Sequence, residues 1–203
     1  KSNDYNLVYK KAIEYYNKGD YQRAMNLLDG VRSVFVGQAK AQNIAYYRAF
    51  CSYNMKDYQI ASDLFKQFIQ TYPESSFAEE CLYMMGFCDY KASPKPRLDQ
   101  QVTEKAIREF QLYLSRYPYS MRKDKVNTYM DEMRDKLSYK AYLSAKNYYL
   151  REHYKAAVIS LQNCLKDYPG SKYREEIMYM LFVSKYQMAV NSVEDKKVER
   201  YNN

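Results

Sequence analysis

The chain has 203 residues, a length that suits one long repeat domain or two short ones, and its mean hydropathy of −0.73 excludes an integral membrane protein. Only five glycines and five prolines are present, which favours helices over a β fold with many tight turns. The net charge of +8 comes from interspersed residues of both signs rather than from a basic block, and this argues against nucleic acid as a partner.

Hydrophobic periodicity along the chain predicts a succession of amphipathic helices joined by short turns. We expect helices over residues 3–17, 20–34, 39–55, 58–71, 76–91, 101–116, 121–150, 154–167 and 172–191, with a further helix beginning near residue 194. The seventh is long because no proline or glycine interrupts residues 121–150. We expect its apolar face to be shared between neighbouring repeats.

A Tyr-Pro-x-Ser sequence recurs at the end of three of these helices, at residues 72–75, 117–120 and 168–171. The composite of helix, short turn, helix and Tyr-Pro-x-Ser resembles the tetratricopeptide repeat of about 34 residues. We expect repeats over residues 3–35, 39–75, 76–120, 121–171 and 172–203, of which the last is partial. The sequence therefore predicts an all-α, tetratricopeptide-like α-solenoid of four complete repeats and the start of a fifth, forming a single domain over residues 1–203.

Aligning the first helix of each repeat places tyrosines at two positions that are two helical turns apart and so share one face. The first position holds Tyr9, Tyr46, Tyr83, Tyr142 and Tyr179, and the second holds Tyr16, Tyr53, Tyr90, Tyr149 and Tyr186. Mostly small residues lie between them and allow close helix packing: Ala12, Ala49, Gly86, Ala145 and Phe182. The tyrosines are interpreted either as helix-packing residues or as the lining of a concave, peptide-binding surface.

A middle position on the same face is basic only at Lys146 and apolar in the other repeats. This composition favours an apolar or aromatic peptide over one clamped by its carboxylate. The predicted groove consists of Tyr9, Ile13, Tyr16, Tyr46, Phe50, Tyr53, Tyr83, Phe87 and Tyr90.

Candidate catalytic and metal-binding residues are few. The cysteines Cys51, Cys81, Cys88 and Cys164 form no Cys-x-x-Cys pair and are expected to be buried packing residues. The single histidine, His153, is expected in a turn at a helix N-terminus. Neighbouring carboxylates such as Glu79 and Glu80 should point apart on their helix. We therefore expect no enzyme activity, metal or cofactor.

An insertion of about eight residues, expected at 92–100, separates the two helices of the third repeat. The sequence Ser-Pro-Lys-Pro-Arg-Leu-Asp-Gln-Gln, at residues 93–101, is followed by an Ala-x-x-x-Phe helix and Arg-Tyr-Pro-x-Ser. Together with the long helix over 121–150, this segment resembles the BamD family of outer-membrane β-barrel assembly lipoproteins. The matching residues are Arg97, Asp99, Gln100, Ala106, Phe110, Arg116, Tyr117, Pro118 and Ser120.

The resemblance implies a non-catalytic periplasmic protein, anchored to the outer membrane by a lipidated cysteine that would lie upstream of Lys1. Its implied partners are the periplasmic domains of the β-barrel insertase and nascent outer-membrane proteins. We expect the insertase to contact the insert and the basic residues of the long helix and later turns: Arg97, Asp99, Arg122, Lys123, Arg151 and Lys172. A general repeat scaffold for peptidoglycan or division proteins, and a nutrient-binding helical-repeat lipoprotein, remain the alternatives.

Overall fold

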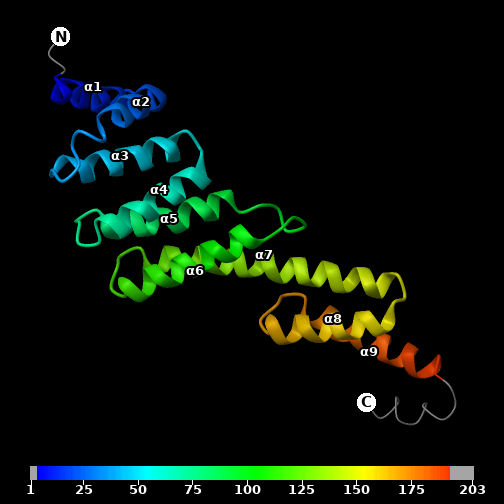
Figure 1. Ribbon diagram of the computed structural model, residues 1–203. Helices are drawn as coiled ribbons and strands as arrows, with labels where there is room; N and C mark the ends of the chain where they lie inside the picture. Colours follow the sequence, from blue (N-terminus) through cyan, green and yellow to red (C-terminus); the bar gives the residue numbers. More distant parts are fainter. Residues whose placement is uncertain (1–3, 193–203) are drawn as a thin grey trace. The chain divides into compact units, whose positions relative to one another are not determined.

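The computed structural model describes residues 4–192, and within that range every regular element is an α-helix (Figure 1). The helices are α1 (Tyr5–Asn17), α2 (Tyr21–Val31), α3 (Lys40–Asn54), α4 (Tyr58–Thr71), α5 (Ala78–Ala92), α6 (Gln101–Arg116), α7 (Lys123–Leu150), α8 (Tyr154–Asp167) and α9 (Arg174–Val190). The predicted all-α class of tetratricopeptide-like helix pairs is confirmed. The helix predicted near residue 194 lies outside the described residues.

The described helices include none that is both long and apolar enough to cross a membrane.

The contacts within the chain group its residues into two compact units. Unit 1 contains Lys1–Pro94 and Asp99–Met130, and unit 2 contains Lys95–Leu98 and Asp131–Asn203. The division falls inside α7, so the first turns of this helix pack in unit 1 and the remainder packs in unit 2. The sequence predicted that neighbouring repeats share the apolar face of this helix, and its residues are divided between the two units.

In three repeats, the turn between the two helices contains one residue in the left-handed backbone conformation, at the same position of the turn. Gly19, Lys56 and Glu152 have φ values of 79°, 67° and 60°, and each follows the first helix of its pair. The next residue donates its backbone N–H to a carbonyl near the end of that helix, for example from Asp57 to Ser52 at 3.0 Å. These bonds satisfy carbonyls that the helix end leaves open.

The Tyr-Pro-x-Ser sequences form a second recurring turn. Tyr72, Tyr117 and Tyr168 each end a helix with φ near −130°, and the following proline cannot continue it. The serine two residues beyond the proline then accepts a hydrogen bond from the backbone two positions later, as from Arg122 to Ser120 at 3.2 Å. The Tyr-Pro-x-Ser motif therefore ends one helix, and its serine hydroxyl binds the backbone just before the next helix begins.

The core of unit 1 depends on a close approach of α5 to α6. A Cβ added at Gly86 would lie 2.9 Å from the ring of Phe110, which is fully buried. Ala12, Ala49 and Ala145 occupy the same repeat position and are also fully buried. The prediction of small packing residues is confirmed at these positions, whereas Phe182, the large residue at the same repeat position, is 69% exposed.

Candidate protein-interaction site

The first helices of unit 1 present a continuous row of aromatic rings, which we call the aromatic face. It consists of Tyr16, Tyr46, Tyr47, Phe50, Tyr53, Phe87, Tyr90 and Tyr129. Adjacent members have ring centroids 4.5 to 6.4 Å apart, the range in which aromatic pairs attract one another. All of them are half-buried, so each ring both packs on the fold and contributes to the surface.

The predicted groove residues are partly brought together by this arrangement. Six of them belong to the aromatic face. Tyr83 is 7% exposed and packs against Phe110 and Tyr113 behind it. Tyr9 packs against Phe35 at 6.3 Å and, like Ile13, lies on α1. Two members were missed, Tyr47 and Tyr129, because both lie outside the two tyrosine positions of the repeat alignment.

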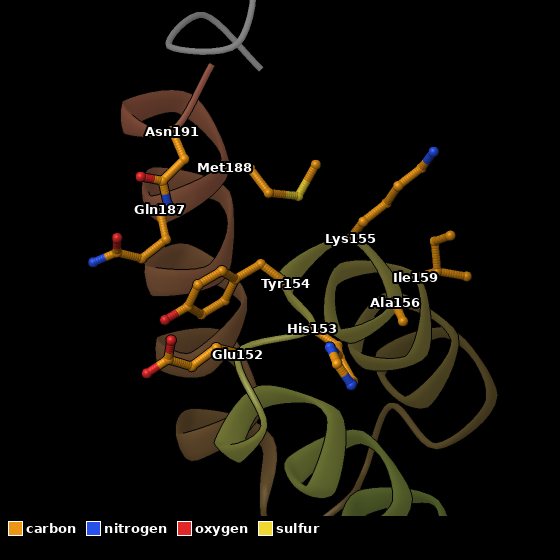
Figure 2. Close-up of a pocket in the computed structure, with 9 residues that line it drawn as sticks. All are labelled: Glu152, His153, Tyr154, Lys155, Ala156, Ile159, Gln187, Met188 and Asn191. Carbon is orange, nitrogen blue, oxygen red and sulfur yellow. The ribbon is translucent and has the colours of Figure 1, made fainter.

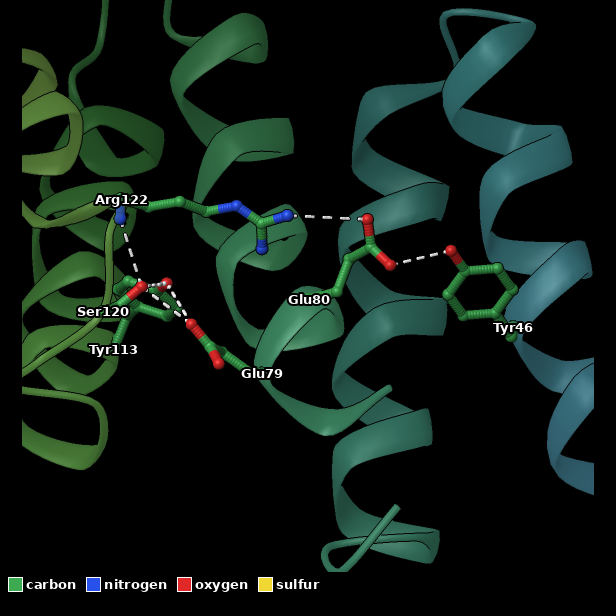
Figure 3. A network of polar contacts seen from close by, with 6 residues as sticks. All are labelled: Tyr46, Glu79, Glu80, Tyr113, Ser120 and Arg122. Carbon is green, nitrogen blue, oxygen red and sulfur yellow. Dashed lines mark hydrogen bonds and ion pairs between the residues drawn. The ribbon is translucent and has the colours of Figure 1, made fainter. Parts of the chain in front are cut away.

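Several tyrosine hydroxyls donate a hydrogen bond to a glutamate that lies 34 residues away, after the tyrosine at Tyr46 and Tyr142 and before it at Tyr113. Tyr46 donates to Glu80 at 2.8 Å, and Tyr113 donates to Glu79 at 2.9 Å (Figure 3). In unit 2, Tyr142 donates to Glu176 at 2.7 Å. The 34-residue spacing equals one repeat, so this pairing was detectable in the sequence but was not predicted.

The neighbouring carboxylates Glu79 and Glu80 point apart, as predicted. Figure 3 shows Glu80 between Tyr46 and Arg122, and Glu79 beside Tyr113 and Ser120. Burial, followed by the hydrogen bond to Glu80, raises the pKa of Tyr46 well above its usual range. These carboxylates therefore serve to link helices rather than to act as an acid–base pair.

Tyr53 differs from the other tyrosines of the aromatic face. Within the described residues its hydroxyl has no hydrogen-bond partner, whereas Tyr16 and Tyr46 are bonded to Asn54 and Glu80. Its ring lies 6.2 Å from Phe87 and 5.8 Å from Tyr58, so it makes only peripheral ring contacts. Tyr53 thus offers both an apolar ring and a free hydroxyl to a ligand.

Two lysines border the aromatic face at its α5 and α7 end. The Lys91 ammonium lies 5.2 Å from the centre of the Phe87 ring, and the Lys125 ammonium lies 6.0 Å from that of Tyr129. Both side chains are exposed. Cations beside aromatic rings are favourable and also attract anions. The face is therefore less purely apolar than the sequence suggested.

The predicted docking residues are divided between the two units. Arg122 lies 3.7 Å from Glu80 and stacks 4.8 Å over Tyr83, so it is engaged within unit 1. Lys172 is 3.9 Å from Asp135 in unit 2. Lys123 and Arg151 are exposed at the two ends of α7. The remaining two, Arg97 and Asp99, belong to the insert.

The insert is held at its base by hydrogen bonds between side chains. Ser93 and Thr103 have their hydroxyl oxygens 2.5 Å apart, and Thr103 donates to the buried Gln100 at 2.7 Å. Asp99 accepts a hydrogen bond from the backbone N–H of Gln101 at 2.9 Å, in the turn that leads into α6. The Asp99 side chain therefore helps to fix the loop.

A buried charged cluster joins α4, α5 and α6 and was not predicted. Asp89, 2% exposed, lies 2.9 Å from the Lys105 ammonium and accepts a hydrogen bond from Ser62 at 3.0 Å. Lys105 also lies 3.7 Å from Glu109. Burial, followed by the hydrogen bond and charge of Asp89, raises the pKa of Glu109 to about 8. Asp89 and Glu109 are buried and Lys105 is half-buried over them, so the cluster links helices of unit 1.

The cysteines and the histidine take the places expected for them. All four cysteines are buried without a disulfide, and burial raises the pKa of Cys51 and Cys81 to about 12. Their thiols are therefore protonated and unreactive at neutral pH. His153 is exposed at the N-cap position of α8. The part of the chain that the structure describes contains no cluster of metal-ligating residues.

A cavity of about 640 Å³ lies between the start of α8 and the end of α9. Figure 2 shows His153 and Tyr154 on its α8 side and Gln187 and Asn191 on its α9 side. Asn191 stands one residue before the end of the described range. We assign no site to this cavity.

A family model described as "YfiO: Outer membrane lipoprotein" matches residues 1–200. The chain belongs to this family. The expected relationship to outer-membrane lipoproteins is therefore confirmed. No curated protein matches the chain significantly.

Proposed function

We propose that this protein is a non-catalytic periplasmic scaffold of the machinery that assembles β-barrel proteins in the outer membrane. It would be lipid-anchored, dock on the periplasmic domains of the insertase and assist the recruitment of nascent outer-membrane proteins. Membership of an outer-membrane lipoprotein family supports this role.

The aromatic face carries the proposal. Transmembrane β-strands alternate apolar and polar residues and bear aromatic girdles at the membrane interfaces. Rings spaced at 4.5 to 6.4 Å can receive the aromatic side chains of such a strand before it is inserted. The hydroxyl of Tyr53 is available to the peptide backbone, and Lys91 and Lys125 are available to a carboxylate.

The experiment measures binding of a labelled peptide of about ten residues, with alternating aromatic side chains and a terminal phenylalanine, to the full chain. Tyr53→Ala removes a ring that makes peripheral contacts, and we expect about three- to tenfold weaker binding with helicity unchanged. Tyr46 and Phe50 are poorer choices because they hold Glu80 and Phe65, so their removal also disturbs packing.

The matched control is Tyr148→Ala, which removes a 40% exposed tyrosine on α7 that is outside the aromatic face. It should leave peptide affinity unchanged. Equal affinity for the wild type and Tyr53→Ala would contradict the assignment of this face. Equal loss in both variants would show that tyrosine removal acts non-specifically and would also contradict it.

The insertase side of the proposal is tested by co-purification from an envelope extract. Lys123→Glu and Arg151→Glu reverse exposed charges at the two ends of α7, and we expect reduced recovery of the insertase in at least one of them. Lys166→Glu, an exposed residue of α8, is the charge-matched control. Recovery of a peptidoglycan or division protein in place of the insertase would favour the general-scaffold alternative.

A further inference from the structure

The tip of the insert and the second half of α7 form a cleft in unit 2 that we call the insert cleft. Its volume is about 510 Å³. Its polar lining comes from Arg97, Lys140, Ser144, Lys146 and Asn147, and Leu143 and Leu150 supply the apolar part. No lining residue is acidic.

The insert, which forms one side of the cleft, is held against α7, which forms the other side, by a hydrogen bond. The Lys140 ammonium donates to the carbonyl oxygen of Leu98 at 2.9 Å, and the Leu98 N–H donates to the carbonyl of Lys95 at 3.0 Å. Pro94 and Pro96 restrict the backbone of the same loop. The position of Arg97 is thereby set by the backbone on both sides of it.

The three cations of the cleft, Arg97, Lys140 and Lys146, differ in the partners that they have within the chain. Lys146 is paired with Glu176 at 2.8 Å, and Lys140 is bonded to a carbonyl that leaves its charge uncompensated. The guanidinium of Arg97 has no polar or charged partner among residues 4–192, and its side chain is exposed. The cleft therefore has one free planar cation, Arg97, beside the uncompensated charge of Lys140.

We propose that the insert cleft docks an acidic segment of a protein partner, with one carboxylate of that segment on Arg97 and an adjacent apolar side chain against Leu150. A guanidinium binds a carboxylate through two parallel hydrogen bonds, a geometry that lysine cannot offer. Leu150 is 66% exposed, so covering it removes apolar surface from water. Ser144 and Asn147, both exposed, supply donors and acceptors for the backbone of the segment.

An acidic protein segment fits this cleft better than an anionic membrane surface. Lys146 is neutralised by Glu176 and Lys140 is held by a carbonyl, so Arg97 alone has its donors free, and the cleft is not a dense basic patch. The amide and hydroxyl groups between the leucines match a peptide, whereas a lipid surface would require several free cations on one plane. The inference rests on the proposed scaffold role, for which it names the chemistry of one docking contact.

The first test uses the purified full chain and an amphipathic peptide of about fifteen residues built from leucine and aspartate, with an asparagine analogue as the neutral probe. Arg97→Glu should weaken binding of the acidic peptide about tenfold or more, and Leu150→Ser should weaken it about threefold. Lys166→Glu makes the same charge change on α8, outside the cleft, and should stay within about twofold of the wild type.

Three results would overturn the inference: no binding of the acidic peptide, equal binding of the asparagine analogue, or equal losses in Arg97→Glu and Lys166→Glu. Vesicles containing phosphatidylglycerol form a separate arm. Vesicle binding that depends on Arg97, with peptide binding that does not, would assign the cleft to the membrane and reject a protein segment.

The second test identifies the natural partner segment with a photo-crosslinking amino acid in place of the exposed Ser144 in the intact cell envelope. The crosslinked peptide should be net acidic, and a charge-reversed partner segment should restore crosslinking to the Arg97→Glu chain. A crosslinked segment that is net basic would reject the inference. An acidic segment from a protein other than the insertase would uphold the cleft while contradicting the proposed insertase dock.

Discussion

Helices α5 and α9 occupy the same place in their repeats but differ sharply in burial. Tyr83 on α5 is 7% exposed, whereas Tyr179 at the same repeat position on α9 is 64% exposed. Gly86 is buried, whereas its counterpart Phe182 is 69% exposed. Helix α5 packs against both α4 and α6, and α9 packs against α8. The burial of this repeat face thus depends on the neighbouring helices rather than on the residue type.

The largest difference should come from removing the two corresponding tyrosines. Tyr83→Ala deletes a ring that packs against Phe87 and Phe110, and we expect unit 1 to lose about 3–5 kcal/mol of unfolding free energy. Tyr179→Ala removes an exposed ring and should change the stability of unit 2 by less than about 0.5 kcal/mol. Urea denaturation followed by circular dichroism measures both. Similar losses would show that Tyr179 is buried in solution.

A second contrast concerns the pKa values of two glutamates, Glu109 on α6 and Glu176 on α9. The pKa of Glu109 is raised to about 8, first by burial and then by Asp89, so the folded chain holds a proton that the unfolded chain releases above its ordinary pKa of 4.5. This contribution is fully present below about pH 4.5 and is lost as pH rises through about 8. We expect unit 1 to lose on the order of 2 kcal/mol over that interval.

Glu109→Gln should remove most of this pH dependence, because it keeps the shape of the side chain without the titration. Asp89, Lys105 and Cys88 face the same cluster and are unchanged in the variant. Glu176 behaves oppositely, since its hydrogen bonds to Lys146 and Tyr142 lower its pKa, and its contribution is lost as pH falls. Thermal melts across pH separate the two, and an unchanged slope in Glu109→Gln would refute the assignment.

The close contact between α5 and α6 provides a third contrast. Gly86→Ala places a Cβ 2.9 Å from the Phe110 ring, and alanine also favours the helix by about 1 kcal/mol, so we expect a net loss of about 1–2 kcal/mol. In a Phe110→Leu background the same change should cost less, because the ring is gone. Equal costs in both backgrounds would show that the ring does not limit the approach of the helices.

Much of the fold follows from sequence periodicity, as two examples show. The Tyr-Pro-x-Ser residues predict helix ends because proline acts locally, and the helices do end at Tyr72, Tyr117 and Tyr168. The glutamate partners of Tyr46 and Tyr142 could have been found from their 34-residue spacing. The local effect of proline therefore predicts the helix ends, and the repeat spacing predicts the tyrosine–glutamate pairs.

The remaining features depend on tertiary neighbours that no local pattern encodes. Phe182 has the apolar character of a packing residue, yet its exposure depends on which helix covers it. Arg122 resembles any other surface cation in the sequence, and only the structure places it between Glu80 and Tyr83. Arg97 in contrast was singled out by its position in an insert, and the insert forms one wall of a cleft.

The smallest expected change in stability comes from the backbone conformation of two turns, one in each unit. Lys56 in unit 1 and Glu152 in unit 2 have φ values of 67° and 60°, a conformation that glycine adopts without a steric cost, as at Gly19. Lys56→Gly and Glu152→Gly should each stabilise their unit by about 0.5–1 kcal/mol, and the two gains should be alike because the turn geometry is the same. Urea denaturation measures both gains, with Gln162→Gly at an exposed interior position of α8 as a control that should destabilise by about 1 kcal/mol. A gain at Lys56 with a loss at Glu152 would mean that the two turns differ in solution. Equal gains would show that the two turns have the same backbone geometry in both units.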